Sequence, residues 1–377
     1  MKKIKVGIVG CGFIGMGKHL PSMMKVEGVE PVAFCDIVPE RAQAAAKQFG
    51  GHDALVCTDY RDLLNRTDID AVHVCTPNST HAEISIAAMK AGKHVMCEKP
   101  MAKTAAEAKA MLDVSRETGK LLTIGYQNRF REDSLFMKSL CQQGELGDIY
   151  LGKAFATRRR GVPTWGVFMD KEKQGGGPLI DLGTHALDLT LWMMENYEPV
   201  SALGSTFDKI GKLGSPANSM GPWDPAKYEV EDSAFGLVKF KNGTTVILEA
   251  SWALNTVISN EAMTLLCGTK AGADMFPPEG PGVRTAEAQA APTYHVRVNG
   301  ENAGKLYLQN YAMGAAFIGD GSQPERFAGG TKEAQAWFRA VRGEAELVVK
   351  PEQAYTVTAI LEAIYKSAAS GDIVRLG

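Results

Sequence analysis

Two side chains four residues apart carry the clearest sign of proton-transfer chemistry in this sequence. Asp181 and His185 lie in a run, Leu179–Leu189, with helical spacing, which places them on one face about a turn apart. An imidazole, with an ordinary pKa of about 6.5, can accept the proton of a hydroxyl group as a hydride leaves the adjacent carbon. Asp181 can orient that imidazole or bind a substrate hydroxyl. Two other interpretations stay open: a buried core histidine, and a metal-binding pair, although no third ligand is evident nearby.

A lysine follows a core strand directly. Glu98-Lys99-Pro100 comes just after the apolar segment His94–Cys97, and open α/β sheets bind ligands beyond the carboxyl ends of their strands. An ammonium group there can hydrogen-bond a hydroxyl or carbonyl oxygen and stabilise developing negative charge. Pro100 constrains the turn and can take a cis bond. A solvated loop lysine is the alternative, and the position at a strand end disfavours it.

A glycine turn near the start of the chain indicates a dinucleotide site. The strand Lys3–Val9 runs directly into Gly10-Cys11-Gly12-Phe13-Ile14-Gly15. In this order Gly10 makes the tight turn, Gly12 lets the pyrophosphate approach the backbone, and Gly15 packs the following helix on the strand. We therefore expect the cofactor to contact Gly10, Gly12, Phe13, Ile14 and Gly15.

Asp36 indicates which dinucleotide is bound. It ends a second strand, Pro31–Cys35, about 20 residues after the last glycine, as the dinucleotide fingerprint requires. A carboxylate at this position accepts both ribose hydroxyls of NAD and repels the extra phosphate of NADP, for which Arg41 is the nearest cation. NAD is favoured over NADP. The alternative is an Asp that caps the helix beginning near Pro39.

Two further segments are candidates for ligand contacts. Thr76-Pro77-Asn78-Ser79-Thr80-His81 follows a strand end and can line the nicotinamide side of the site, although Ser79 or Thr80 can instead cap a helix. Arg158-Arg159-Arg160 ends a strand before Trp165, and Arg158 and Arg160 would share one face of it. They can bind an anionic substrate group, and solvation at the surface is the favoured alternative.

The elements that must position these residues predict two domains. Short apolar strands alternate with helices up to residue 125, which predicts a parallel sheet covered on both faces. Longer alternating segments follow, with an Asn242-Gly243 hairpin turn, and predict a mostly antiparallel sheet. The fold class is therefore α/β: a Rossmann domain and an α+β domain with a large open sheet. We expect the boundaries 1–125, 126–350 and a C-terminal helix in 351–377 that packs back near the domain junction. Residues 211–225 and 277–292, rich in Gly, Pro and Ala, are expected to be loops.

Composition limits the class of protein. The 41 basic and 43 acidic residues nearly balance, so no global field favours nucleic acid or an anionic membrane. No apolar run reaches the length of a membrane span, and no secretory signal is evident. The seven cysteines include no C-x-x-C pair, and Cys35, Cys75 and Cys97 fall in or at the ends of core strands. We expect reduced, buried thiols in a cytoplasmic protein.

The ordered motifs resemble the glucose–fructose oxidoreductase / inositol dehydrogenase (Gfo/Idh/MocA) family over nearly the whole chain. The motifs are Gly10–Gly15, Cys75–His81, Glu98-Lys99-Pro100, Gly125–Phe130 and Asp181-x-x-x-His185. The resemblance implies a catalytic group of Lys99, Asp181 and His185, with a cis Lys-Pro bond. It also implies NAD(P)-dependent oxidation of a secondary hydroxyl of a sugar or polyol by a homodimer or homotetramer. The expected cofactor contacts beyond the glycine turn are Asp36, Thr76, Pro77, Asn78, His81, Glu98, Lys99 and Gln127. The expected substrate contacts are Lys99, Tyr126, Arg129, Arg158, Trp165, Asp181 and His185.

Hydride transfer between nicotinamide and a ring carbon of a sugar or glycoside is therefore the predicted reaction. One rival is an NAD-dependent glycoside hydrolase that acts by transient oxidation, elimination, water addition and reduction. The other is an NAD-sensing or scaffold protein without activity, which the presence of both Lys99 and His185 disfavours.

Overall fold

The computed structural model describes residues 3–257, 259–277, 293–314 and 329–377. The chain divides into two compact units. The first comprises Met1–Phe130 and Glu325–Tyr355, and the second Arg131–Pro324 and Thr356–Gly377. The sequence-based boundaries assigned residues 325–350 to the second domain, whereas this division places them in the first unit. No described helix is long and apolar enough to cross a membrane.

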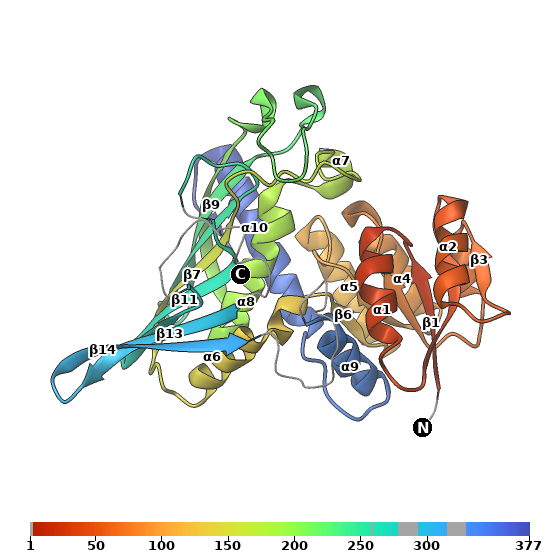
Figure 1. Cartoon of the computed structure of the whole chain (residues 1–377), viewed down its shortest axis with the longest axis horizontal. Coiled ribbons are helices and arrows are strands. Elements are labelled where there is room, and N and C mark those ends of the chain that lie inside the picture. The colour runs from red at the N-terminus through yellow and green to blue at the C-terminus, as the bar shows by residue number, and fades with distance from the viewer. Residues whose placement is uncertain (1–2, 258, 278–292, 315–328) are drawn as a thin grey trace. The chain divides into compact units, whose positions relative to one another are not determined.

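The first unit is built on a parallel sheet of six strands in the order β3-β2-β1-β4-β5-β6 (Figure 1). The order reverses between β1 and β4, which makes their carboxyl ends the point where such sheets bind ligands. Nearly every residue of β1 is buried, because helices cover both faces of a doubly wound sheet. The parallel sheet predicted from the sequence is confirmed. Its strands are Ile4–Val9, Val29–Cys35, Leu55–Cys57, Ala71–Val74, His94–Cys97 and Leu122–Ile124.

Capping residues in the sequence mark where helix α5 of this unit begins and ends. Thr104 and Glu107 form a capping box at the start of α5, and Gly119, with φ 65°, ends it. The segment after the glycine turn is less regular than expected, since a π-helical turn, η1, precedes a single turn of α1. The helical elements are η1 Gly15–His19, α1 Leu20–Met23, α2 Pro39–Phe49, α3 Tyr60–Leu64, η2 Asn78–Thr80, α4 His81–Lys90, α5 Ala105–Thr118, η3 Gln127–Phe130 and α9 Gly330–Val341.

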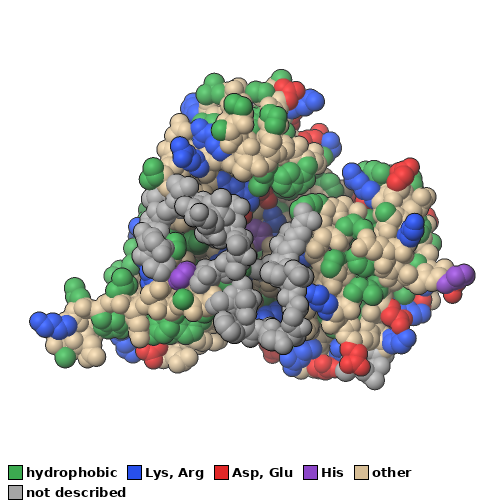
Figure 2. Space-filling view, in the orientation of Figure 1, with side chains coloured by type: hydrophobic (Ala, Val, Ile, Leu, Met, Phe, Trp, Pro, Cys, Tyr) green, Lys and Arg blue, Asp and Glu red, His purple; other side chains and the backbone are tan. Residues whose placement is uncertain are grey.

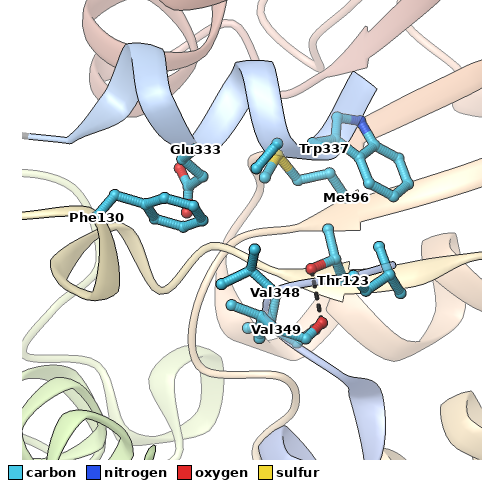
Figure 3. A pocket seen from close by; sticks show the side chains of 10 residues that line it. Met96, Thr123, Phe130, Glu333, Trp337, Val348 and Val349 are labelled. Carbon is cyan, nitrogen blue, oxygen red and sulfur yellow. Dashed lines mark hydrogen bonds between the residues drawn. The ribbon is translucent and has the colours of Figure 1, made fainter. Parts of the chain in front are cut away.

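Hydrophobic packing explains why residues after 329 belong to the first unit. Trp337 and Phe338 of α9 join the core cluster formed by β1, β2 and α1. The chain then runs along β6, where the Thr123 hydroxyl donates a 3.0 Å hydrogen bond to the Val349 carbonyl (Figure 3). Burying this apolar face requires long-range contacts that sequence periodicity does not reveal.

The second unit is built on a sheet of nine strands in the order β14-β13-β12-β11-β7-β10-β9-β8-β15 (Figure 1). Among the described strands of this sheet only β7 and β10 pair in parallel, so the predicted mostly antiparallel sheet is confirmed. The expected hairpin turn joins β9 and β10, with Gly243 at φ 88°. The strands are β7 Ile149–Thr157, β8 Pro199–Phe207, β9 Ser233–Phe240, β10 Thr245–Ser251, β11 Glu261–Gly268, β12 Ala271–Asp274, β13 Thr293–Asn302, β14 Lys305–Gly314 and β15 Val374–Arg375.

One face of this sheet is covered by helices. A Cβ on Gly152 would lie 3.0 Å from Thr190 of α8, and one on Gly236 would lie 2.5 Å from Ile364 of α10. Small residues on the strands therefore let both helices pack closely. The helical elements are α6 Glu132–Gln142, α7 Lys171–Gln174, η4 Leu179–Gly183, α8 Thr184–Met194, η5 Gly211–Leu213, η6 Pro225–Lys227 and α10 Pro351–Ser370, whose first residues belong to the first unit. Most of 277–292 lies outside the described residues.

Candidate active site

The glycine turn after β1 has the geometry that a dinucleotide needs. Gly10 has φ 95°, and a Cβ there would lie 2.5 Å from the Cys75 carbonyl oxygen. A Cβ on Gly15 would lie 2.4 Å from the Gly10 oxygen, so these two positions exclude side chains. A Cβ on Gly12 would meet nothing within 4 Å, which leaves open space at the position expected to face the pyrophosphate.

Asp36 is held by backbone donors at the end of β2. The Cys11 amide donates a 2.8 Å hydrogen bond to Asp36 Oδ2, and the Val38 amide donates a 2.9 Å bond to Oδ1. Each carboxylate oxygen has a second lone pair, so both remain able to accept a ribose hydroxyl. The helix-cap alternative is wrong, because Val38 is the N-cap of α2 and no side chain caps that position.

The segment after β4 is tied to the turn after β5 by a buried histidine. His81 Nδ1 lies 2.8 Å from the Pro100 carbonyl oxygen, and Nε2 lies 2.9 Å from the Thr76 oxygen. Burial lowers the pKa of this imidazole despite the two carbonyls. The Thr80 hydroxyl bonds to Thr76 and Pro77 and does not cap α4. His81 therefore joins two strand ends whose turns carry candidate cofactor residues.

Lys99 lies just beyond the carboxyl end of β5, and the Lys99-Pro100 bond is cis as expected. The Lys99 amide donates a 3.1 Å hydrogen bond to Glu98 Oε2. A Cβ on Gly125 would approach the Glu98 carboxylate to 3.0 Å, so this glycine makes room for it at the end of the adjoining strand β6. The position of Lys99 therefore depends on how the Glu98 carboxylate is held.

A buried charged network holds Glu98. Lys18 Nζ lies 2.5 Å from Glu98 Oε1 and 3.0 Å from Glu333 Oε2, and all three side chains are almost completely buried. His19 Nε2 lies 2.8 Å from Glu98 Oε1, and His19 Nδ1 lies 2.9 Å from Nδ1 of His73. This network joins η1, β4, β5 and α9.

The network sets the protonation states of its members. Burial alone would raise the pKa of Glu98, but Lys18 and His19 outweigh it and hold that pKa well below its usual range. Burial lowers the pKa of both His19 and His73, which keeps them neutral at pH 7. Burial raises the pKa of Glu333 to about 7, against the attraction of Lys18. Figure 3 shows Glu333 extending from α9 beside Phe130.

In the second unit, Asp181 and His185 are buried on consecutive helical turns. Asp181 lies in η4 and His185 in the first turn of α8, and both side chains are under a tenth exposed. The Trp252 indole donates a 3.0 Å hydrogen bond to Asp181 Oδ2. Trp252 packs edge-on against Phe168, which in turn packs against the partly exposed Trp165. No cluster of three metal-ligating side chains occurs among the described residues, so the metal interpretation gains no third ligand.

A second carboxylate, the half-buried Glu231, fixes the start of η4. Glu231 accepts hydrogen bonds from the amides of Gly177 and Leu179, at 2.9 and 3.1 Å, and from the Tyr365 hydroxyl at 2.7 Å. A Cβ on Gly177 would lie 2.3 Å from the Glu231 carbonyl oxygen, so the glycine-rich approach is required by close packing. The segment just before β9 that carries Glu231, and the helix α10 that carries Tyr365, thus hold the turn before Asp181.

The arginine run after β7 is paired with neighbouring groups. Arg158 forms a bidentate ion pair with Glu261, with N–O distances of 2.6 and 2.7 Å. Arg160 donates to the Asn255 side chain at 2.6 Å and to the Leu254 carbonyl at 3.3 Å. Their guanidinium groups are therefore engaged within the second unit, which weakens the argument for an anionic substrate group.

Two of the expected substrate contacts are buried in the first unit. Arg129 is fully buried and donates to the Val348 carbonyl at 2.9 Å and to the Gln353 side chain at 2.8 Å. Tyr126 is 1% exposed. Gln127, an expected cofactor contact, is half-buried in η3. The bonds of Arg129 are those of a residue that holds the segment 348–353 in place.

Comparison with known proteins identifies the fold and the family. Residues 4–126 match the model of the GFO_IDH_MocA oxidoreductase family, NAD-binding Rossmann fold, and residues 135–273 match the GFO/IDH/MocA C-terminal domain. The chain is 36% identical to D-glucoside 3-dehydrogenase of Escherichia coli (strain K12), covering 99% of this chain and 97% of that protein. The chain belongs to the GFO/IDH/MocA oxidoreductase family.

More distant relatives agree with this assignment. Levoglucosan dehydrogenase of Pseudarthrobacter phenanthrenivorans is 29% identical over 67% of this chain and 68% of that protein. The structure of a levoglucosan dehydrogenase in complex with NADH and L-sorbose superposes with a TM-score of 0.79 at 24% identity, covering 100% of both chains, and shows the same fold. For this GFO/IDH/MocA oxidoreductase, the predicted resemblance and the NAD-binding Rossmann fold are confirmed.

Several residues that support the site in this oxidoreductase had no signal in the sequence. Lys18 and Glu333 are 315 positions apart and meet only because α9 packs on the first unit. Trp252 directly follows β10 and Tyr365 lies on α10, and neither stands in a motif with Asp181. Their roles follow from long-range pairing, which a single sequence does not display.

The raised pKa of Glu333 predicts a pH-dependent stability difference. A Glu whose folded pKa exceeds its unfolded value binds more protons when folded, so its ionisation destabilises the protein as pH rises from about 4.5 to about 7. Glu333→Gln cannot ionise. The free energy of unfolding of the variant, minus that of the wild type, should therefore increase by about 3 kcal/mol from pH 5 to pH 8.

Urea unfolding at both pH values measures this difference. The exposed substitution Glu83→Gln is the control and should change stability by less than about 0.5 kcal/mol at either pH. A Glu333→Gln difference that is equal at pH 5 and pH 8 would contradict the assignment.

Proposed function

We propose that this protein oxidises a secondary ring hydroxyl of a D-glucoside, at C3 or a similar position, and transfers the hydride to NAD. The proposal rests on one arrangement in the first unit: the glycine turn and Asp36 lie at the carboxyl ends of β1 and β2, and Lys99 lies at that end of β5. The glucoside is proposed because a D-glucoside 3-dehydrogenase shares 36% identity with nearly the whole chain.

We propose that the cofactor is held by the turn Gly10–Gly15, Asp36 and the segment Thr76–Asn78. Asp36 accepts the adenosine ribose hydroxyls and disfavours a 2′-phosphate. His81 and Glu98 position these turns through the hydrogen bonds described above. When bound, NAD supplies the hydride acceptor at C4 of its nicotinamide.

Three side chains of the chain itself carry the proton and charge changes in this proposal. His185 accepts the hydroxyl proton, so that the carbinol carbon can release its hydride. The Lys99 ammonium hydrogen-bonds the same oxygen and stabilises the negative charge that develops on it. Asp181, held by Trp252, orients the imidazole or the substrate. Trp165 is a candidate sugar contact, because a partly exposed indole can stack on a sugar face.

The products of a glucoside reaction test the proposal. We expect incubation with NAD and an aryl glucoside to yield NADH and oxidised glucoside in a one-to-one ratio, measured by absorbance at 340 nm (a property of NADH) and by mass spectrometry. Release of the aglycone without net NADH would instead indicate the redox-neutral hydrolase. Absence of both, across glucosides and inositols, would contradict the proposed function.

We further propose that the protein is a cytoplasmic homo-oligomer that uses the face of the nine-stranded sheet opposite to α8 and α10. Leu203, Phe207 and Leu237 are about two-fifths exposed on that face, and Leu203 pairs with Leu237 across β8 and β9. Exposed apolar rows of this kind are typical of interfaces. Apolar side chains are also exposed on the β13–β14 hairpin (Figure 2). Leu306 and Leu308 of β14 are 87% and 66% exposed.

A further inference from the structure

Three cysteines adjoin Asp36, the residue whose carboxylate is expected to bind the adenosine ribose. Cys11 lies in the glycine turn, and its amide donates to Asp36 Oδ2 at 2.8 Å. The Cys11 thiol lies 3.7 Å from the carbonyl oxygen of Cys35, the residue before Asp36. The Asp36 amide in turn donates a 3.3 Å hydrogen bond to the Cys57 carbonyl at the end of β3. The proposed reaction uses none of these thiols.

Cys35 and Cys57 are direct partners in the parallel register of β2 and β3. Neighbouring strands lie about 4.8 Å apart, which falls within the range of Cα separations that a disulfide spans, about 4.4 to 6.8 Å. Their side chains lie on the same face of the sheet, since they are in register, and the Cys57 thiol lies 3.9 Å from the carbonyl oxygen of Phe34, the residue before Cys35. The pair therefore needs only a small adjustment to form a bond.

The Cys35 and Cys57 thiols differ in exposure and in pKa, the two properties that decide which thiol is oxidised first. Cys57 is the more exposed of the two thiols, and its pairing with Cys35 lowers the pKa of Cys57 and raises that of Cys35. Burial raises the pKa of Cys11 to about 12, so that Cys11 stays a thiol. Cys57 is thus suited to be the attacking thiolate, with Cys35 as the resolving thiol.

We propose that Cys35 and Cys57 form a reversible disulfide that weakens binding of the dinucleotide. Oxidation by a hydroperoxide proceeds in two balanced steps. The Cys57 thiolate attacks the peroxide oxygen, which breaks the O–O bond, releases an alcohol or water and leaves a sulfenic acid. Cys35 then attacks that sulfur, releasing water and forming the S–S bond, so that two thiols are oxidised by two electrons as one peroxide is reduced.

The disulfide would act on the cofactor through Asp36. Drawing the two sulfurs together to the disulfide length of about 2.05 Å moves the ends of β2 and β3, and Asp36 is the residue after Cys35. Both the Asp36–Cys57 and the Cys11–Asp36 hydrogen bonds lie at that end. Thermodynamic linkage between two sites is reciprocal. If the disulfide weakens NADH binding by some factor, bound NADH must disfavour disulfide formation by the same factor. This effect rests on the proposed ribose contact of Asp36.

Peroxide treatment of the full chain, with and without saturating NADH, tests the proposal. We expect the oxidised protein to lose 2 Da per bond formed, peptide mapping to link Cys35 with Cys57, and the Kd of NADH to rise about tenfold, reversed by dithiothreitol. Saturating NADH should slow the mass change. The Cys57→Ser and Cys35→Ser variants should resist all of these effects, whereas the control Cys267→Ser should behave as the wild type.

Two outcomes would overturn the inference. One is the absence of a linked Cys35–Cys57 peptide from the oxidised protein. The other is an oxidised protein that carries this link but binds NADH with an unchanged Kd. Asp36→Asn separates this test from the proposed function. If that substitution leaves NADH affinity unaltered, the ribose contact is wrong, while the mass and mapping results still report on the disulfide itself.

Discussion

Replacing His185 with alanine is expected to lower kcat for glucoside oxidation by about 10³, because general-base catalysis contributes about 10² to 10⁴ to such a step. The proton of the substrate hydroxyl would then have no positioned acceptor as the hydride leaves. Binding of NADH should not change, since the proposed dinucleotide contacts belong to other elements. Steady-state production of NADH and fluorescence titration of NADH measure the two quantities separately.

A double-mutant comparison tests whether His185 and Lys99 serve one hydroxyl. Lys99→Ala alone should cost about 10² to 10³ in kcat. Groups that act as a unit are not additive, so the double variant should lose little more than the worse single variant. Losses that multiply would contradict the shared role. His52→Ala, which removes an exposed histidine, is the matched control and should retain full activity.

Replacing Lys18 with methionine is expected to destabilise the protein by about 3 to 5 kcal/mol. Lys18 is 2% exposed and faces two carboxylates, and removing one partner of a buried ion pair leaves the others without compensation. Urea unfolding at pH 7.5 measures the loss. Because Glu98 also accepts the Lys99 amide, the folded fraction should show reduced kcat as well.

Neutralising the two carboxylates that Lys18→Met leaves unpaired should restore part of the lost stability. The triple variant Lys18→Met, Glu98→Gln, Glu333→Gln retains similar volume without buried charge, so we expect it to be more stable than Lys18→Met alone. Lys5→Met, which breaks an exposed pair with Asp68, should cost less than about 1 kcal/mol. A cost below 1 kcal/mol for Lys18→Met itself would show that the network does not stabilise the fold.

The sequence carried the local determinants of the fold accurately. Helix α2 begins at Pro39 as expected, and α10, Pro351–Ser370, lies within the expected C-terminal helix 351–377, because helix signals act over a few residues. Strand β5, His94–Cys97, was also located by its short apolar run. The order of motifs along the chain indicated the family, and the comparisons confirmed it.

The sequence alone predicted which residues do the chemistry, and it located the chain segments that carry them: the glycine turn, Asp36, Lys99 and the Asp181–His185 pair. The tertiary structure alone revealed how these groups are held. The return of α9 to the first unit, the Lys18–Glu98–Glu333 network and the Trp252–Asp181 bond join residues far apart in the chain. The physical reason is that burial and charge pairing depend on which surfaces pack together, and local periodicity does not encode that choice.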